Sequence, residues 1–433
     1  MIPRMSMKRT LLLLIAALLL MPLLLVLWQL TSNPDTQITS KPPENNAALV
    51  QRGAYLARAG NCLACHTQRG GEAYAGGRAI ATPFGDIYTS NITPDKTTGI
   101  GNWTADDFWR ALHNGRSKDG SFLYPAFPYP NYTKVTREDS DALYAFLRAL
   151  PAVRQTNKAP DLRFPYNRRI LLAFWRTLYF KPGSFVADTT QSAEWNRGAY
   201  LVQGLGHCSA CHTSRNALGG TVADHDLGGA LIPMLNWHAS SLTSNADTGL
   251  GAWDAKEIAS LLKTGVSAQG AVFGPMAEVV SKSLQHLSDD DIRAMANYLK
   301  TMPDTRPTQK PATYSPTPEN EALLKTGAKL YEQHCADCHG ADGKGKALAY
   351  PSLAGKVTLT SASPVNPIRI VLNGGFPPST AGNPRPYGMP PFGYMMTNEE
   401  VAAVVSYIRT QWGNQGSLVS PFDVARAKGM ISE

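Results

Sequence analysis

The 433-residue chain is long enough for about three domains of ordinary size. Its 43% hydrophobic and 17% charged residues are typical of a globular protein that also carries a membrane element. Lysine and arginine outnumber aspartate and glutamate by 41 to 33, a formal charge of +8, and Arg4, Lys8 and Arg9 supply three of these charges before an apolar segment. The small excess that remains gives no reason to expect a nucleic-acid partner.

An uninterrupted apolar run extends from Leu11 to Trp28 behind this basic start. The run approaches the length of a bilayer span and is somewhat long for the core of a cleaved signal peptide. No small-x-small cleavage site follows Trp28, so residues 1–33 are predicted to be an uncleaved transmembrane anchor, with a cleaved signal as the alternative. The basic flank should stay in the cytoplasm. We therefore expect a protein of the cell inner membrane, in contact with lipid, whose remaining residues lie in the periplasm.

A five-residue pattern, Cys-x-x-Cys-His, occurs three times after this segment. Its copies are Cys62, Cys65 and His66; Cys208, Cys211 and His212; and Cys335, Cys338 and His339. The pattern is the attachment site of c-type haem. Two thiols on one helical turn can each bond to a vinyl group of the same porphyrin, and the adjacent histidine then lies beneath the ring as an iron ligand. Three covalent haems are therefore predicted, and they use all six cysteines.

A zinc site or a redox dithiol is the alternative for a single Cys-x-x-Cys pair. A zinc site needs a second pair of ligands nearby, whereas each copy here has its own adjacent histidine. Three copies, each inside a stretch of about one small domain, favour haem for the whole set.

The stretches around the three motifs are similar to one another, which predicts three copies of one small helical domain. The expected fold is mostly α, with three tandem cytochrome c-like domains behind the N-terminal transmembrane helix. The predicted divisions are the domains 34–153, 193–302 and 319–414, an aromatic and basic connector 154–192, a proline-rich linker 303–318 and a tail 415–433.

Each domain is expected to open with a helix that leads into its motif and to close with a capped helix. The closing helices should begin at Thr136, Ser288 and Thr397, each with an acidic residue three positions later. Ten residues after each cap stands an aromatic residue, and each opening helix carries a glycine; the predicted pairs are Phe146 with Gly53, Tyr298 with Gly198, and Tyr407 with Gly327. Since glycine has no side chain, it should let the two helices cross closely.

The connector near Pro160–Phe185 is rich in aromatic and basic residues and should be helical from Asn167. It could lie on the membrane surface or on a partner subunit. Burial between the first two domains is the alternative.

The second axial ligand of an electron-transfer haem is often methionine. Met276 is the candidate in the second domain. Met389 is the candidate in the third, with Met395 and Met396 as rivals. The first domain has no methionine, and Phe127 stands where one is expected. Its only other histidine, His113, is either the sixth ligand or a residue at the haem edge beside a five-coordinate iron.

The motifs, together with "TPFGDIYTSNITPD", "GIGNW", "GGALIPMLNWHASSLTSNADTGLGAW" and "GPMAEVV", resemble the three-haem cytochrome c subunits of bacterial membrane-bound dehydrogenases. That family passes electrons from the catalytic subunit of an alcohol, gluconate, sorbitol or aldehyde dehydrogenase to ubiquinone. The segments "LYPAFPY", "DLRFPYNRR" and "SAEWNRGAYLVQGLGHCSACHTSRNALG" are most similar to the branch that accompanies molybdenum hydroxylases: aldehyde dehydrogenases and nicotinate or isoquinoline oxidoreductases. The resemblance implies a molybdopterin subunit and a small [2Fe–2S] subunit as partners.

Three functional classes are weighed. Electron transfer is favoured, with substrate oxidised on another subunit, so that the chain is not an enzyme by itself. A quinoprotein alcohol dehydrogenase or a flavin gluconate or sorbitol dehydrogenase is the alternative partner. Peroxidase-like catalysis at the first haem, and membership of a terminal oxidase, are the other two classes.

Overall fold

The computed structural model describes residues 46–429 except 223, 225, 247 and 305–313, together with Lys8, Leu20, Met21, Leu24, 26–29 and Thr31. Most of the predicted span Leu11–Trp28 and most of the predicted linker 303–318 therefore lie outside the described residues. In the part that is described, no helix has both the length and the apolar composition needed to cross a bilayer. The anchor at residues 1–33 stays a prediction.

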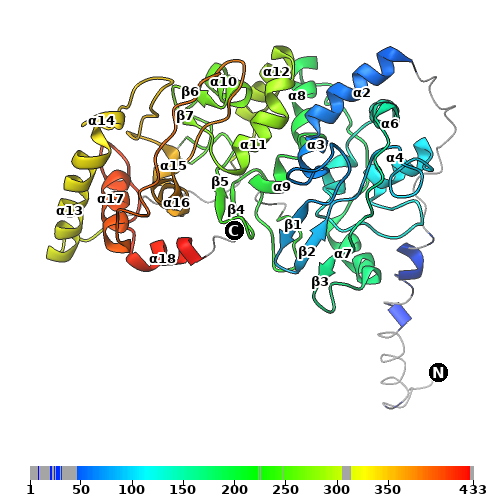
Figure 1. The fold of residues 1–433 in the computed structure, drawn as a ribbon, viewed down its shortest axis with the longest axis horizontal. Helices are drawn as coiled ribbons and strands as arrows, with labels where there is room; N and C mark the ends of the chain where they lie inside the picture. The colour runs from blue at the N-terminus through cyan, green and yellow to red at the C-terminus, as the bar shows by residue number, and fades with distance from the viewer. Residues whose placement is uncertain are drawn as a thin grey trace, which may run out of the picture.

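The chain is mostly helical, as predicted, and forms three successive helical units (Figure 1). The first contains α2 (Ala47–Ala59), α3 (Cys62–Cys65), β1 (Ala79–Thr82), β2 (Gly85–Tyr88), α4 (Ala105–Asn114), α5 (Tyr129–Tyr132) and α6 (Arg137–Ala149). The second contains α8 (Ala193–Gln203), α9 (Ser209–His212), β4 (Ala230–Ile232), β5 (Trp237–Ala239), α10 (Ala255–Thr264), β6 (Val266–Ser267), β7 (Gly270–Ala271), α11 (Pro275–Lys282), the 3-10 helix η3 (Leu284–His286) and α12 (Asp289–Lys300). The third contains α13 (Pro318–His334), α14 (Ala336–His339), α15 (Val357–Thr360), α16 (Val365–Asn373), α17 (Asn398–Thr410) and α18 (Pro421–Gly429).

The connector between the first two units contains β3 (Asp161–Leu162), the 3-10 helix η1 (Arg169–Leu171) and α7 (Leu172–Tyr179). Strand β3 pairs antiparallel with β2, Gly85 opposite Leu162, so that β1, β2 and β3 form a small sheet. Strands β4 with β5 and β6 with β7 form two short antiparallel hairpins.

The predicted helix caps are confirmed. The hydroxyl groups of Thr136, Ser288 and Thr397 accept hydrogen bonds from the backbone N–H groups of Asp139, Asp291 and Glu400. In α17 the Glu400 carboxylate also accepts from the N–H of Thr397, which completes a capping box. Each cap fixes where a closing helix starts, and so fixes which of its residues face the opening helix.

The predicted crossings of opening and closing helices are confirmed as well. A Cβ atom added to Gly53, Gly198 or Gly327 would lie 2.7 Å, 2.9 Å or 2.8 Å from the Cβ of Phe146, Tyr298 or Tyr407, respectively. It would lie closer still to a carbonyl oxygen of the closing helix, at 1.9 Å, 2.0 Å or 2.2 Å. The three units thus share one close helix contact, which leaves no space for any side chain.

Replacing Gly198 by alanine should therefore lower the free energy of unfolding by about 1–3 kcal/mol or more, since overpacking at a close contact forces the helices apart. The added Cβ would meet the carbonyl oxygen of Ala294 at 2.0 Å. Thermal unfolding followed by circular dichroism measures the effect. Gly429→Ala is the matched control, because no atom lies within 4 Å of the added group there. Equal melting temperatures for the two variants would contradict the proposed role of the crossing.

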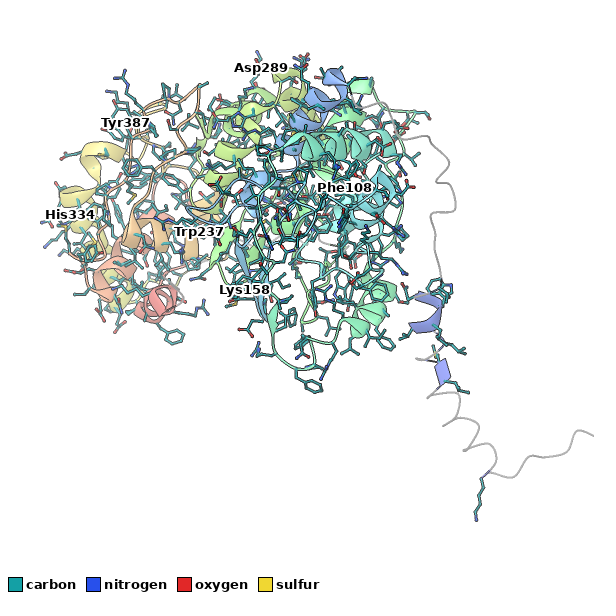
Figure 2. The ribbon with its side chains drawn as sticks, turned by 45° about the vertical axis from the view of Figure 1, so that its right-hand side comes forward. Phe108, Lys158, Trp237, Asp289, His334 and Tyr387 are labelled. Atoms are coloured by element: carbon teal, nitrogen blue, oxygen red, sulfur yellow. The ribbon has the colours of Figure 1, made fainter. Side chains whose placement is uncertain are left out.

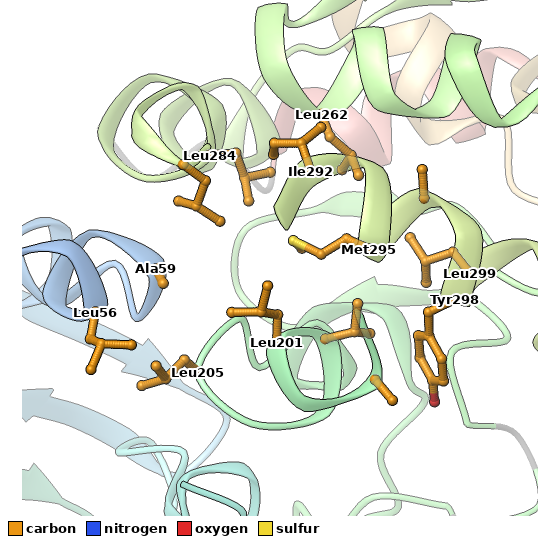
Figure 3. Close-up of a cluster of buried hydrophobic side chains, with 14 of the residues drawn as sticks. Leu56, Ala59, Leu201, Leu205, Leu262, Leu284, Ile292, Met295, Tyr298 and Leu299 are labelled. Atoms are coloured by element: carbon orange, nitrogen blue, oxygen red, sulfur yellow. The ribbon is translucent and has the colours of Figure 1, made fainter. Parts of the chain in front are cut away.

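The first two units share one hydrophobic core (Figure 3). Leu56 and Ala59 of α2 belong to the same buried cluster as Leu201 and Leu205 of the second unit. Met295 lies in this core and is 1% exposed, as expected for a methionine in the middle of a helix. A separate cluster, formed by residues 331–427, is the core of the third unit. The chain therefore consists of a paired body and a third unit beside it.

Reciprocal hydrogen bonds hold the pair together. Tyr55 of the first unit donates to Asp291 of the second at 2.6 Å, and Tyr200 of the second donates to Asp139 of the first at 2.6 Å. Each carboxylate also accepts a hydrogen bond from the arginine of its own unit, Arg52 or Arg197. Burial alone would raise the pKa of Asp291, but the bonds from Arg197 and Tyr55 outweigh it and hold the pKa below its ordinary value.

The connector has one buried and one exposed face, so it combines features of both predicted alternatives. Arg176 of α7 is buried, donates to the carbonyl oxygen of Asn114 and lies against three aromatic rings of the first unit and the connector. Trp175 donates to the carbonyl oxygen of Leu218 in the second unit. Phe164, before η1, and Leu178 of α7 are exposed at 76% and 66%.

Candidate haem sites

Each Cys-x-x-Cys-His motif follows the opening helix of its unit and forms a single helical turn. These turns are α3, α9 and α14. Asn61 and His207, which directly precede the first two motifs, have positive φ angles of 51° and 37° and turn the chain away from the opening helix. One turn brings the two cysteines of each motif to the same side of the helix, as attachment to one porphyrin requires.

The three motif histidines have the same hydrogen-bonding geometry. The Nδ1 atoms of His66, His212 and His339 lie 2.7 Å, 2.6 Å and 2.9 Å from the carbonyl oxygens of Ser90, Ser240 and Pro351. A carbonyl oxygen can only accept, so Nδ1 carries the proton and Nε2 keeps its lone pair. Burial also lowers the pKa of each histidine, which favours the neutral ring. The residues present therefore fit an iron ligand held in one orientation by a backbone acceptor.

Burial affects the first cysteine thiol of each motif. Burial raises the pKa of Cys62 and of Cys208 to about 12, and that of Cys335 to about 11. A reactive redox dithiol needs a stabilised thiolate, which requires the opposite shift of the pKa. Among the described residues, no three His, Cys, Asp or Glu side chains gather in a metal-binding group. The donor set fits thioether attachment of haem better than either alternative.

The two predicted distal methionines, Met276 at the start of a helix and Met389 on a loop, pack against the hydrophobic cores of their units. Met276 follows Gly274 and Pro275 at the start of α11 and packs against the core of the paired body. Met389 packs against the core of the third unit, and its backbone pairs with Gly375 through hydrogen bonds of 2.8 Å and 3.0 Å. Met396, one of the rivals, is 6% exposed in that core, and the other, Met395, is 65% exposed.

In the first unit, Phe127 and Pro128 stand where the third unit has Met389 and Pro390. Phe127 lies nine residues before the closing-helix cap Thr136, and Met389 lies eight residues before Thr397. The Phe127 ring packs against Tyr132 at 5.2 Å and joins the core of the paired body. The first and third units thus have a similar loop before the closing helix, which carries a phenyl ring in the first and a thioether in the third.

His113 lies in the last turn of α4 and stacks on Trp109, with the ring centroids 4.3 Å apart. The side chains of α4 that join the core of the paired body are Phe108 and Leu112, which lie one position before Trp109 and His113. His113 and Trp109 thus form a pair on α4 next to the pair that faces the core of the paired body. Ligation of the first haem iron by His113 stays a prediction.

Sequence reasoning missed the residues that join the first two units. Besides the Tyr–Asp bonds, Arg78 of the first unit forms a two-fold ion pair with Glu278, two residues after Met276, at 2.6 Å and 2.9 Å. A hint was present in the repeated sequence Arg-Gly-Ala-Tyr, which occurs at residues 52–55 and 197–200. The third unit has Thr326 and Lys329 at the positions of the arginine and the tyrosine.

The fold and the three motif turns define a multi-domain c-type cytochrome. The cytochrome c family model matches residues 50–151, 196–303 and 324–412, and each match contains one motif. The chain belongs to the cytochrome c family, which implies covalently bound haem c and its iron, and several haems in one chain.

Three relatives show how wide the similarity is. The chain is 40% identical over 406 residues to the cytochrome c subunit of a quinone alcohol dehydrogenase from Gluconacetobacter polyoxogenes, covering 90% of this chain and 86% of the relative. It is 43% identical over 396 residues to the gluconate 2-dehydrogenase cytochrome c subunit of Pantoea cypripedii, covering 88% and 89%. It is 40% identical over 369 residues to a subunit of the nicotinate dehydrogenase of Pseudomonas putida, covering 84% of this chain and 30% of that protein.

Proposed function

We propose that this chain is the electron-transfer subunit of a dehydrogenase complex and carries three covalent haems. The observation that carries the proposal is the threefold motif turn, in which each histidine keeps its Nδ1 on a backbone carbonyl oxygen. Cys62 and Cys65, Cys208 and Cys211, and Cys335 and Cys338 attach the haems, and His66, His212 and His339 are the proximal ligands. Bound haem supplies one-electron oxidation and reduction at its iron.

Met276 and Met389 are the proposed distal ligands of the second and third haems, because both pack against the core of their unit and precede its closing helix in the chain. Methionine ligation raises the reduction potential. For the first haem we propose a distal side covered by Phe127, with no methionine ligand. The protein then holds haems of different potential, which favours electron flow in one direction.

Substrate oxidation takes place on another subunit in this proposal, which the names of the relatives as dehydrogenase cytochrome subunits support. The proposed partners are a molybdopterin subunit and a [2Fe–2S] subunit, and the similarity to the nicotinate dehydrogenase subunit of Pseudomonas putida speaks for them. A quinoprotein alcohol dehydrogenase or a flavin gluconate dehydrogenase is the second candidate, favoured by the other two relatives. The sequence identities of the chain to the three relatives, 40%, 43% and 40%, favour these partners about equally.

The proposed electron acceptor is ubiquinone, and the proposed location is the periplasmic side of the inner membrane, with residues 1–33 as the anchor. The described end of that segment supports this placement: the Gln29 side chain donates to Thr177 of α7 at 3.0 Å, and Arg116 donates to the Gln29 carbonyl oxygen. The exposed apolar face of the connector then lies next to the lipid surface.

Purification of the tagged chain in mild detergent, with metal and cofactor analysis of whatever co-elutes, tests the partner. Molybdenum and non-haem iron in amounts comparable to the chain are expected. Pyrroloquinoline quinone or flavin in their place would contradict the molybdopterin assignment and leave the haem assignments intact. Peroxide-dependent turnover by the isolated chain would instead favour a catalytic first haem.

A further inference from the structure

A cavity lies at the junction of the paired body and the third unit. It has a volume of about 140 Å³, is partly open to solvent, and is lined by the β4–β5 hairpin on one side and by α16 and α18 on the other. Val365, Ile368 and Ala427 form its apolar wall, and each is less than 9% exposed. A cavity of about 150 Å³ lined by apolar side chains is large enough to bind benzene. This junction cavity therefore has room for one six-membered ring.

Three polar side chains of different chemistry also line the cavity. Asn236 is 6% exposed, and its Nδ2 atom has no hydrogen-bond partner among the described residues. A buried donor without an acceptor is costly and points to a missing partner. The Asp423 carboxylate is held by the backbone and hydroxyl of Ser420 at 3.0 Å and 2.7 Å, and Arg426 lies beside it, exposed to solvent. The cavity offers a hydrogen-bond donor inside and a water-accessible carboxylate at its edge.

The cavity has a predicted haem unit on each side. Ile368 belongs to the core of the third unit, which also contains Cys335 and contacts Met389. On the other side, Trp237 follows Asn236, and its indole ring fills the space beside Gly274, where an added Cβ would meet it at 2.5 Å. Gly274 lies two residues before Met276. Figure 2 shows Trp237 where the paired body meets the third unit, and Arg369 of α16 covers its ring at 4.9 Å.

The β4–β5 hairpin and α18, which line the cavity, lie in the lower half of the folded body in Figure 1, as do β3, α7 and the described residues 26–29. Exposed apolar side chains occur in three of these elements or directly beside them: Phe164 at 76%, Leu231 at 51% and Phe422 at 73%. Exposed apolar side chains near a cavity suit a ligand that partitions into a bilayer.

We propose that this junction cavity binds the ring of a membrane quinone, which deepens the function proposed above and rests on it. The ring lies between Ile368 and Ala427, and Asn236 donates to one of its carbonyl oxygens. Reduction of a quinone to its quinol takes two electrons and two protons. Haems held by the second and third units would supply the two electrons, one each, and the two protons would come from solvent by way of Asp423.

The test uses the full-length, haem-loaded protein in detergent and a short-chain ubiquinol as probe. Ubiquinol should reduce the oxidised haems, since a site that passes electrons one way also passes them back, and the haem absorbance reports the rate. Ala427→Phe fills the cavity and should slow this reaction at least tenfold. Ala425→Phe, the same change at an exposed position of the same helix that does not line the cavity, should leave the rate unchanged. Dithionite should reduce all three proteins at the same rate.

A second measurement does not depend on electron transfer. A photoreactive azido-ubiquinone should label peptides of the β4–β5 hairpin, α16 or α18 in the unsubstituted protein, and Ala427→Phe should abolish this labelling. Asn236→Asp removes the buried N–H donor. Aspartate, like asparagine, tolerates the positive φ of 50° at this position, so the hairpin should stay folded. This variant should therefore show weaker labelling.

The outcomes separate the two proposals. Labelling of other segments, or an unchanged ubiquinol rate in Ala427→Phe, would overturn the junction cavity as the site and leave the electron-transfer function standing. A protein that ubiquinol does not reduce and azido-ubiquinone does not label would instead show that quinone is not the acceptor.

Discussion

Replacing Phe127 by methionine should raise the reduction potential of the first haem by on the order of 0.1–0.3 V, a fraction of the roughly 0.8 V over which axial ligands set haem potentials. Phe127 occupies the loop position of Met389 and packs into the core of the paired body, so that a methionine there has a comparable position. Its thioether would stabilise ferrous over ferric iron. Potentiometric titration, with the three haems resolved by their spectra, measures the change.

Met276→Phe is the matched reverse substitution and should lower the potential of the second haem. The unsubstituted first haem should also give a high-spin electron paramagnetic resonance signal, which Phe127→Met should convert to low-spin. His113→Ala tests the other candidate ligand, since loss of a low-spin signal in that variant would show that His113 binds the iron. An unchanged potential in Phe127→Met would contradict the assignment of this loop to the distal side.

Cutting the chain at two different places should give opposite results. A chain that ends at Asp304 keeps the paired body and should fold with two haems per molecule. A chain that ends at Phe180, before the second unit, should fail to give a stable first unit. The reason is the shared core, in which large apolar side chains of both units are buried together. Each is worth about 1.5–3 kcal/mol, and a few of them equal the total stability of about 5–15 kcal/mol that a domain usually has.

Haem content per chain and cooperative thermal unfolding distinguish the two fragments. The matched comparison is the third unit expressed alone, from Ser315 onward, which has its own core and should fold with one haem. A stable single-haem first unit would contradict this prediction, because it would show that the first unit folds without the part of the core that the second unit supplies. Loss of both haems from the longer fragment would show that the third unit supports the pair.

Features set by neighbouring residues could be predicted from the sequence. The caps at Thr136, Ser288 and Thr397 depend on two residues three positions apart, and the glycine crossings follow from a fixed spacing repeated in three units. The motif residues could be found for the same reason, because covalent attachment fixes their spacing.

Features set by contacts between distant segments could not be predicted. The bonds from Tyr55 to Asp291 and from Tyr200 to Asp139 join residues more than 60 positions apart, and either partner alone reads as an ordinary surface residue. The junction cavity is of the same kind, since Asn236 and Ala427 come from different units. Nothing local in "MLNWH" indicates that the amide of Asn236 is buried against another unit.

The reciprocal bonds of the paired body have a consequence for how such a chain arose. The tyrosine of each Arg-Gly-Ala-Tyr sequence donates to the closing-helix aspartate of the other unit, so the contact is isologous and would join two identical copies equally well. The first two units therefore have the form of a homodimer whose halves became fused into one chain. An isologous contact is complete with two members. The third unit, with Thr326 and Lys329 in place of the arginine and the tyrosine, had to be added through a different surface.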